Sequence, residues 1–154
     1  MRHTSHCPIA YSLDLIGDRW TLLVLRDLLI VGKRRFGELL AAPEGIATNI
    51  LSARLRRLEA EGLLRRERDP DNGRQVLYTP TPKALDLLPA MLELVRWAAR
   101  HDPLTAAPRS FVRRIAHERE ALIDEIRARH PRAGGDPGHA RSRTRELRTS
   151  RKGN

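Results

Sequence analysis

The stretch TNILSARLRRLEAEGLLRRERDPDNGRQVLYT, residues 48–79, decides the fold. In its first part, apolar side chains recur at the spacing of one helix face, which predicts a helix over residues 48–61. Gly62 then ends this helix, since glycine readily adopts the left-handed conformation that follows many helices. In its second part, residues 63–68 and 75–79 flank a turn containing Asn-Gly, which is a strong signal for a β-hairpin. A helix followed directly by a basic hairpin is the pattern of a winged helix-turn-helix domain.

Three helices are predicted upstream of this stretch. Residues 9–16 and 19–31 carry apolar side chains at helical spacing, and a short helix over 36–41 follows them. Asp18 is expected to be the N-cap of the second helix, because its carboxylate can accept hydrogen bonds from the first free backbone N–H groups. Apolar residues cover most of the circumference of the 19–31 helix, so we expect that helix at the centre of the core.

Further helices are predicted after the hairpin. Apolar side chains repeat over residues 83–100, and Pro89 is expected to kink that helix. These apolar positions are too many for a helix that follows a complete core, so part of the stripe is expected to pack against a second chain. Another helix is predicted over residues 110–129.

The fold class is therefore mainly α with a small β-hairpin. We expect a winged helix-turn-helix domain with a long dimerisation helix at residues 1–103, and a C-terminal helical extension at 104–130. Residues 131–154 are rich in Gly, Pro, Arg and Ser with almost nothing apolar, which predicts a disordered basic tail.

The chain is strongly basic, with a formal net charge of +10 over 154 residues. An acidic partner, such as nucleic acid or an anionic membrane surface, is the first expectation from such a charge. Half of the excess lies in residues 131–154, so the position of the basic residues matters more than their number. Cys7 is the only cysteine, which excludes an intrachain disulfide framework. The sequence shows neither a signal peptide nor an apolar segment of membrane-spanning length, and we expect a cytoplasmic protein with no membrane partner.

The outward face of the helix before the hairpin is polar near its start and basic beyond it. At about 100° per residue, Asn49, Ser52 and Arg56 lie opposite the apolar side, and Thr48 and Arg57 flank them. Asn can pair bidentately with adenine and Arg with guanine, while Ser or Thr suits either base. These residues are therefore predicted to contact DNA. The alternative is the solvated face of an ordinary amphipathic helix.

Two further basic groups are predicted to contact the DNA backbone. Lys33, Arg34 and Arg35 form a cluster between two helices, which would clamp phosphates. Arg74 follows the hairpin turn, from where it would reach a neighbouring minor groove or its phosphates. The alternatives are simple solvation of the cluster, and hairpin charges that protect an edge strand from aggregation.

A series of short motifs runs from the start of the chain to the long helix after the hairpin. They are Cys7-Pro8, LIGDRW at 15–20, LRD at 25–27, GK at 32–33, FGELL at 36–40, GIATNIL at 45–51, RL at 54–55, GL at 62–63, YTPT at 78–81 and Trp97. Taken together, and only then, these motifs are specific: the chain resembles the HxlR family of regulators over residues 5–103.

The resemblance implies a homodimeric winged-helix regulator, joined through its N-terminal helix and the long helix after the hairpin. It also implies a possible redox sensor at Cys7, since members of the family often use a cysteine at this position to sense electrophiles or oxidants. An inert packing cysteine at a helix start is the alternative. A metal site formed by Cys7 with His3 and His6 is a weaker alternative, and no metal is expected.

We therefore expect a sequence-specific regulator of transcription, a repressor, that binds double-stranded DNA as a homodimer on a roughly palindromic operator. A thiol-reactive compound or another small molecule is its expected effector. The chain carries no Gly-rich phosphate loop, zinc-protease motif or nucleophile elbow, so neither an enzyme nor a cofactor is expected. The alternatives are a winged-helix module that binds protein, and a nonspecific nucleic-acid binder acting through its basic tail. A protein-binding helix would expose Leu, Tyr or Phe on its outward face, which the helix before the hairpin does not.

Overall fold

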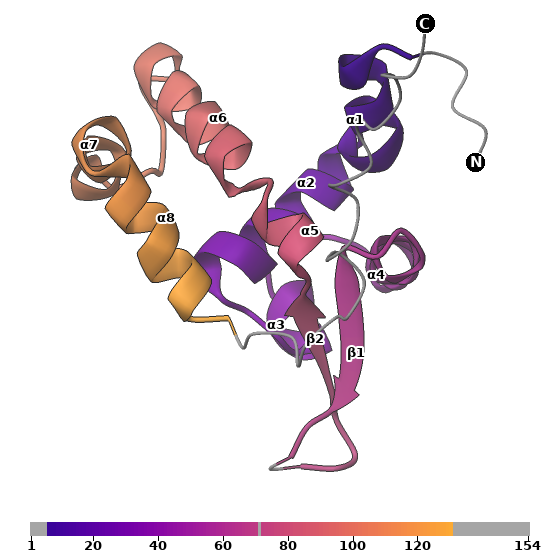
Figure 1. Cartoon of the computed structure of the whole chain (residues 1–154). Coiled ribbons are helices and arrows are strands. Elements are labelled where there is room, and N and C mark those ends of the chain that lie inside the picture. Colours follow the sequence, from indigo (N-terminus) through magenta and orange to yellow (C-terminus); the bar gives the residue numbers. More distant parts are fainter. Residues whose placement is uncertain (1–5, 71, 131–154) are drawn as a thin grey trace, which may run out of the picture.

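A computed structural model describes residues 6–70 and 72–130 of the chain, so the predicted tail at 131–154 lies outside the described residues. The predicted fold class is confirmed: most elements are helices, and the two strands form one antiparallel hairpin, which projects away from the helices in Figure 1. The elements in chain order are α1 (Pro8–Ile16), α2 (Arg19–Arg26), the π-helical turn η1 (Asp27–Val31), α3 (Phe36–Leu40), α4 (Thr48–Ala60), β1 (Leu64–Arg68), β2 (Val76–Pro80), α5 (Pro82–Leu85), α6 (Leu88–His101), α7 (Arg109–His117) and α8 (Arg119–Ala128).

The core forms where α2 and η1 pack against α4 and the base of the hairpin. Leu25 and Leu28 from the first pair and Leu51 from α4 are completely buried, as the predicted central position of this segment requires. Burial of leucine side chains of this size contributes about 1.5–3 kcal/mol each. This packing fixes α4 by its apolar side and leaves its opposite side outside the core.

The predicted helix over residues 19–31 begins as expected but changes type before its end. The Asp18 carboxylate accepts two backbone hydrogen bonds of 3.1 Å, which confirms it as the N-cap. The last five residues form the π-helical turn η1 instead of α-helix. The Asp27 carbonyl accepts from the N–H of Gly32 at 2.9 Å, five residues along, and Gly32 ends the turn with a φ of 86°. The apolar spacing could not show this change, because apolar residues cover most of the circumference of this segment and so favour neither helix type.

The end of α4 is also confirmed. Gly62 follows the helix with a φ of 70°, in the left-handed region that glycine adopts at low cost. The N–H of Leu63 then donates to the carbonyl of Leu58 at 2.8 Å, and the N–H of Gly62 to that of Glu59 at 3.0 Å. Because the N–H of Leu63 takes part in this C-terminal cap of α4, β1 starts at Leu64, one residue later than predicted.

The predicted hairpin is confirmed, with a shift in its second strand. β2 begins at Val76 and includes Pro80, which pairs with Leu64 as the last residue of the ladder. The turn is built on a hydrogen bond of 2.8 Å from the N–H of Gln75 to the carbonyl of Asn72. Gln75 therefore belongs to the turn and not to the strand.

Pro89 interrupts the helix predicted over residues 83–100 and does not merely kink it. The chain forms a short α5 ending at Leu85 and a separate α6, with Pro89 in the first turn of α6. Proline lacks an N–H and clashes with the carbonyl four residues earlier, which here belongs to Leu85. The helix therefore ends where that carbonyl would meet the ring.

The prediction of a single helix over residues 110–129 is wrong, because the chain forms two helices there, α7 and α8, separated at Glu118. Its φ of −132° and ψ of 33° lie outside the helical region, although neither Gly nor Pro marks the site. Tertiary contacts account for the break. Arg119 reaches Glu93 of α6 at 2.7 Å, and the His130 ring contacts the Leu29 carbonyl of η1 at 3.0 Å.

The extension completes the core that the earlier helices begin. Ile115, Leu122, Ile123 and Ile126 are buried in the same cluster as the leucines of α2 and α4. Figure 1 shows α7 and α8 beside α6, on the side of the molecule away from α1. The domain boundary at residue 103 stays a prediction. Within residues 6–70 and 72–130, no helix is long and apolar enough to cross a membrane.

Candidate nucleic-acid interface

The helix α4 presents a polar face to the outside of the molecule. Thr48, Asn49 and Arg56 are exposed and Ser52 is half-buried, whereas Leu58 on the opposite side is only 1% exposed. The spacing of the four polar residues places them along one side of the helix, as predicted. Their amide, hydroxyl and guanidinium groups are therefore available to a ligand that approaches α4 from outside.

Arg57, the fifth residue predicted for this face, is turned towards the protein. Its guanidinium donates to the backbone carbonyl of Asp14 in α1. That contact joins α4 to α1 across 43 residues of sequence. A role for Arg57 in DNA binding stays a prediction.

An ion pair that involves a residue absent from the predicted site fixes the orientation of α4. The Arg54 Nε donates to the Asp18 Oδ1 at 2.8 Å, so α4 is tied to the N-cap of α2. Burial raises the pKa of Asp18, but hydrogen bonds from Thr21 and the charge of Arg54 outweigh this and lower it. The carboxylate therefore caps α2 and anchors α4 at the same time.

The hairpin presents different residues on its two faces. In the antiparallel register, Arg66 pairs with Tyr78 and Arg65 pairs with Thr79. Successive side chains of a strand point to opposite faces, so Arg66 and Tyr78 share one face while Arg65 and Glu67 share the other. Arg66 is one of three arginines in β1, and which of them shares a face with Tyr78 can be established only once the strand pairing is known.

A groove separates α4 from the hairpin. Phe36, Ser52, Leu55, Arg56, Arg66 and Tyr78 line it. Two of the predicted DNA-contacting residues, Ser52 and Arg56, thus lie on one side, and Arg66 of the wing lies on the other. The structure brings α4 and the wing together at this groove.

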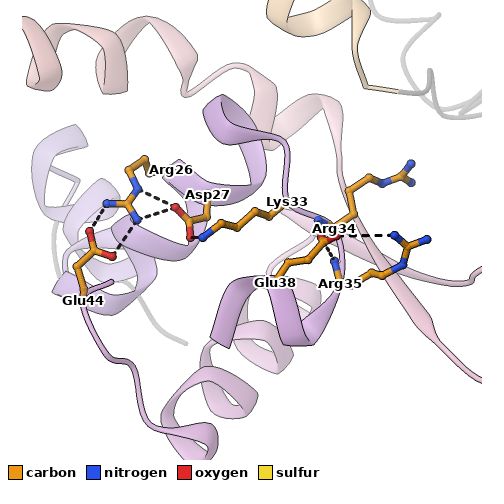
Figure 2. Close-up of polar contacts among 7 residues, drawn as sticks. All are labelled: Arg26, Asp27, Lys33, Arg34, Arg35, Glu38 and Glu44. Atoms are coloured by element: carbon orange, nitrogen blue, oxygen red, sulfur yellow. Dashed lines mark hydrogen bonds and ion pairs between the residues drawn. The ribbon is translucent and has the colours of Figure 1, made fainter. Parts of the chain in front are cut away.

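The predicted basic cluster between η1 and α3 is bound to the protein itself, as Figure 2 shows in part. The Lys33 Nζ lies 2.6 Å from the Asp27 carboxylate. The Arg34 Nη2 donates to the Thr79 hydroxyl at 2.8 Å. The Arg35 Nε and Nη2 both donate to the Asp69 carboxylate, at 2.9 and 2.6 Å. The phosphate contacts of the cluster stay a prediction, since any such contact would compete with these bonds.

The same region contains a second set of ion pairs, which holds the turn before α4. The Arg26 guanidinium bridges Asp27 and Glu44, and Asp27 is only 2% exposed (Figure 2). The hydrogen bond from Arg26 lowers the pKa of Glu44 to about 2. Glu38 of α3 accepts the backbone N–H groups of Arg34 and Arg35, which lowers the pKa of Glu38 as well. Glu44 and Glu38 therefore stay charged, and they fix the loops on either side of α3.

Two predicted residues lie at the periphery. Arg74 is exposed at the hairpin turn, where its N–H donates to the Asn72 side chain at 3.3 Å. Cys7 is exposed and occupies the N-cap position of α1. Within the described residues no group of three His, Cys, Asp or Glu side chains is placed to hold a metal ion, and His3 lies outside those residues.

Large apolar side chains are exposed on α1 and α6. Ile9 and Leu13 of α1 are 68% and 60% exposed, and Leu94 and Trp97 of α6 are 55% and 64% exposed. The two helices that carry them are those that the family resemblance implies for dimerisation.

Comparison with known proteins agrees with this geometry. A family model described as HxlR-like helix-turn-helix matches residues 15–105. The HTH-type transcriptional regulator sll1512 of Synechocystis, itself uncharacterised, is 38% identical over 92 residues, which cover 59% of this chain and 67% of that protein. The uncharacterised HTH-type regulator YvaP of Bacillus subtilis is 33% identical over 64% of this chain and 91% of its own length.

Solved structures show the same fold. PA1607 superposes with a TM-score of 0.62 and 34% identity, over 69% of this chain and 74% of that one. The redox regulator HypR in its oxidised form superposes with a TM-score of 0.55 and 32% identity, over 61% of this chain and 96% of its own.

Proposed function

Because this chain belongs to the HxlR-like helix-turn-helix family of transcriptional regulators, we propose that it represses transcription by binding a roughly palindromic operator as a homodimer. The observation that carries the proposal is the polar outer face of α4 beside a basic wing. A dimer bound in this way represses by covering DNA that the transcription machinery needs.

The chemistry of α4 supports contact with bases. Asn49 and Arg56 are exposed and carry the two side chains that pair bidentately with adenine and guanine, while Thr48 and Ser52 suit either base. Arg74 at the tip of the wing contacts phosphate or the adjacent minor groove. The face lacks the large apolar side chains that a protein partner would need, so DNA is favoured over a protein ligand.

The exposed apolar residues support the homodimer. Ile9, Leu13, Leu94 and Trp97 would be buried if α1 and α6 packed against the same helices of a second chain. Such an interface has two-fold symmetry, and two copies of α4 then lie in successive major grooves about 34 Å apart. A symmetric protein of this kind selects a symmetric operator.

Cys7 is the proposed site at which the regulator senses oxidants or electrophiles. It is exposed, and HypR, one of the structural neighbours, is a redox regulator. Since the chain has one cysteine, a disulfide at Cys7 would join two chains. Cys7 lies at the start of α1, so that bond would form beside the proposed dimer interface.

Selection of bound duplexes from a random-sequence pool, followed by sequencing, tests the proposal. The expected result is an inverted repeat whose half-sites are centred about one helical turn, roughly 10 base pairs, apart. Recovery of sequences without any shared motif would contradict it. Recovery of single half-sites would contradict the homodimer alone.

A further inference from the structure

The groove between α4 and the hairpin has the shape and charge of a phosphate site. Its hollow measures about 270 Å³, whereas a water molecule takes about 30 Å³ in the liquid. Ser52 and Arg56 line it from α4, Arg66 from β1, and Phe36 and Tyr78 supply apolar surface. An anionic group with a carbon skeleton matches such a lining, because guanidinium groups bind phosphate oxygens and apolar surface can pack against a sugar.

The hairpin register aims one wing cation into this groove. Arg66 shares its face with Tyr78, and both line the hollow. Arg65 points to the opposite face, where its Nε lies 3.8 Å from the Glu67 carboxylate. Two adjacent arginines of the same strand thus have different surroundings.

Arg56 and Arg66, the two arginines at the groove, differ in their partners from other basic side chains near α4 and the hairpin. Lys33, Arg35 and Arg54 each pair with a carboxylate of the chain. Within residues 6–70 and 72–130, neither Arg56 nor Arg66 forms an ion pair with Asp or Glu. Both side chains are exposed, so their charges are available to an external anion.

We propose that this groove holds a phosphodiester of the DNA backbone, with Arg66 as its principal phosphate contact. The site rests on the proposed function, since the ligand is the strand whose bases α4 contacts. The backbone would then pass between α4 and the wing, with Arg56 directed to the bases and Arg66 to the phosphate. This arrangement fixes how far α4 enters the major groove.

The salt dependence of DNA binding tests the site. The full chain, Arg66→Ala and the matched control Arg65→Ala are titrated against a fluorescein-labelled duplex of mixed sequence at several salt concentrations. Each phosphate contact contributes about 0.9 to the slope of log K against log salt. Arg66→Ala should therefore flatten the slope by about one unit for each bound protomer, and Arg65→Ala should leave it unchanged. Arg66→Gln, which keeps the uncharged stem of the side chain, should behave like Arg66→Ala, and urea unfolding confirms that each variant is folded.

The possible outcomes separate a failure of the phosphate site from a failure of the proposed DNA-binding function. Equal flattening by Arg65→Ala and Arg66→Ala, or an unchanged slope in both, would overturn the phosphate site while leaving DNA binding intact. A loss of sequence preference in Arg66→Ala without a change in slope would assign Arg66 to bases and also overturn it. A wild-type chain that binds no duplex would overturn the proposed function and the site together.

Discussion

At the scale of single residues, basic side chains that look alike in the sequence differ in what they already bind. Arg35 donates twice to a buried carboxylate, Arg57 donates to a carbonyl of α1, and Arg56 faces the outside of the molecule. The guanidinium of Arg56 makes only a long hydrogen bond of 3.4 Å, from Nε to the Ser52 carbonyl of its own helix, so it is the most available of the three to DNA. The partner of each cation therefore matters more than its presence in a basic cluster.

Cys7 gives a prediction at this scale. Cys7→Ser should bind a selected duplex as tightly as the wild type, because the residue lies outside α4 and the wing. It should no longer respond to diamide, which oxidises thiols to disulfides. Duplex binding measured by fluorescence anisotropy, before and after diamide, checks this. An undiminished response in Cys7→Ser would show that the response to diamide does not arise at Cys7.

Whether a side chain's role can be predicted from the sequence depends on how far along the chain its partner lies. The N-cap at Asp18 and the glycine after α4 could be predicted, because each acts on residues within one turn of itself. The bond between Arg35 and Asp69 joins residues 34 apart in the chain, and no local pattern indicates it. The same holds for Arg54 and for the place of Arg66 at the groove.

At the scale of elements, the wing is attached to the helix-turn-helix unit by side chains. Arg35 is the N-cap residue of α3, and Asp69 follows β1, so their ion pair joins the start of one to the end of the other. Asp69 is only 2% exposed. A buried carboxylate that loses its cation is costly, so this bond is expected to set the position of the hairpin.

A double-mutant cycle tests this attachment. Arg35→Ala and Asp69→Asn should each lower the free energy of unfolding, and the two effects should be coupled by about 0.5–3 kcal/mol. Urea titrations of both single variants and of the double variant give the coupling. The slope of DNA affinity against salt is measured on the same proteins. If Arg35→Ala flattens that slope by about one unit, Arg35 is a phosphate contact, as the sequence predicts.

The ion pair between Arg26 and Glu44, which holds the turn before α4, makes the free energy of unfolding depend on pH. The hydrogen bond from Arg26 lowers the pKa of Glu44 from 4.5 to about 2. A carboxylate whose pKa is lowered by folding stabilises the folded state above its unfolded pKa, and this contribution disappears as the pH falls through the folded pKa. Between pH 4.5 and 2, the wild type should therefore lose more stability than Glu44→Gln does.

Urea unfolding across that pH window is the measurement for Glu44. Glu120→Gln, which removes an exposed carboxylate on α8, is the matched control and should follow the wild type. Parallel curves for the wild type and Glu44→Gln would show that the pair with Arg26 contributes nothing to folding.

At the scale of the whole molecule, the elements after the wing show the limit of local patterns most clearly. The break at Pro89 follows from chemistry that the sequence displays, since proline cannot continue a helix past the carbonyl of Leu85. The break at Glu118 has no such signal, because α8 turns to meet α6 and η1 through Arg119 and His130. The fold class was accessible from spacing and turn residues, whereas the path of the extension depends on tertiary contacts.

The homodimer is a prediction at this scale. The wild type should sediment at twice the chain mass of 17.5 kDa, because exposed apolar residues of α1 and α6 pack against those of the second chain. Trp97→Asp places a charge in that contact and should give the monomer mass. Leu104→Asp changes a residue that is 89% exposed but lies outside both helices, and it should stay dimeric. A monomeric wild type at micromolar concentration would contradict the symmetric operator.

The central claim is that α4 recognises the sequence of duplex DNA, and the ratio of specific to nonspecific affinity tests it most directly. This ratio is measured with a selected duplex and a mixed-sequence duplex for the wild type, Asn49→Ala, Arg56→Ala and Arg74→Ala. Loss of a bidentate base contact costs about 1–3 kcal/mol, so Asn49→Ala and Arg56→Ala should lower the ratio by roughly five- to more than a hundred-fold. Arg74→Ala should weaken both affinities alike and leave the ratio nearly intact. The opposite pattern would contradict the claim: a ratio of specific to nonspecific affinity that stays unchanged in Asn49→Ala and Arg56→Ala but falls to about one in Arg74→Ala. That result would assign sequence recognition to the wing.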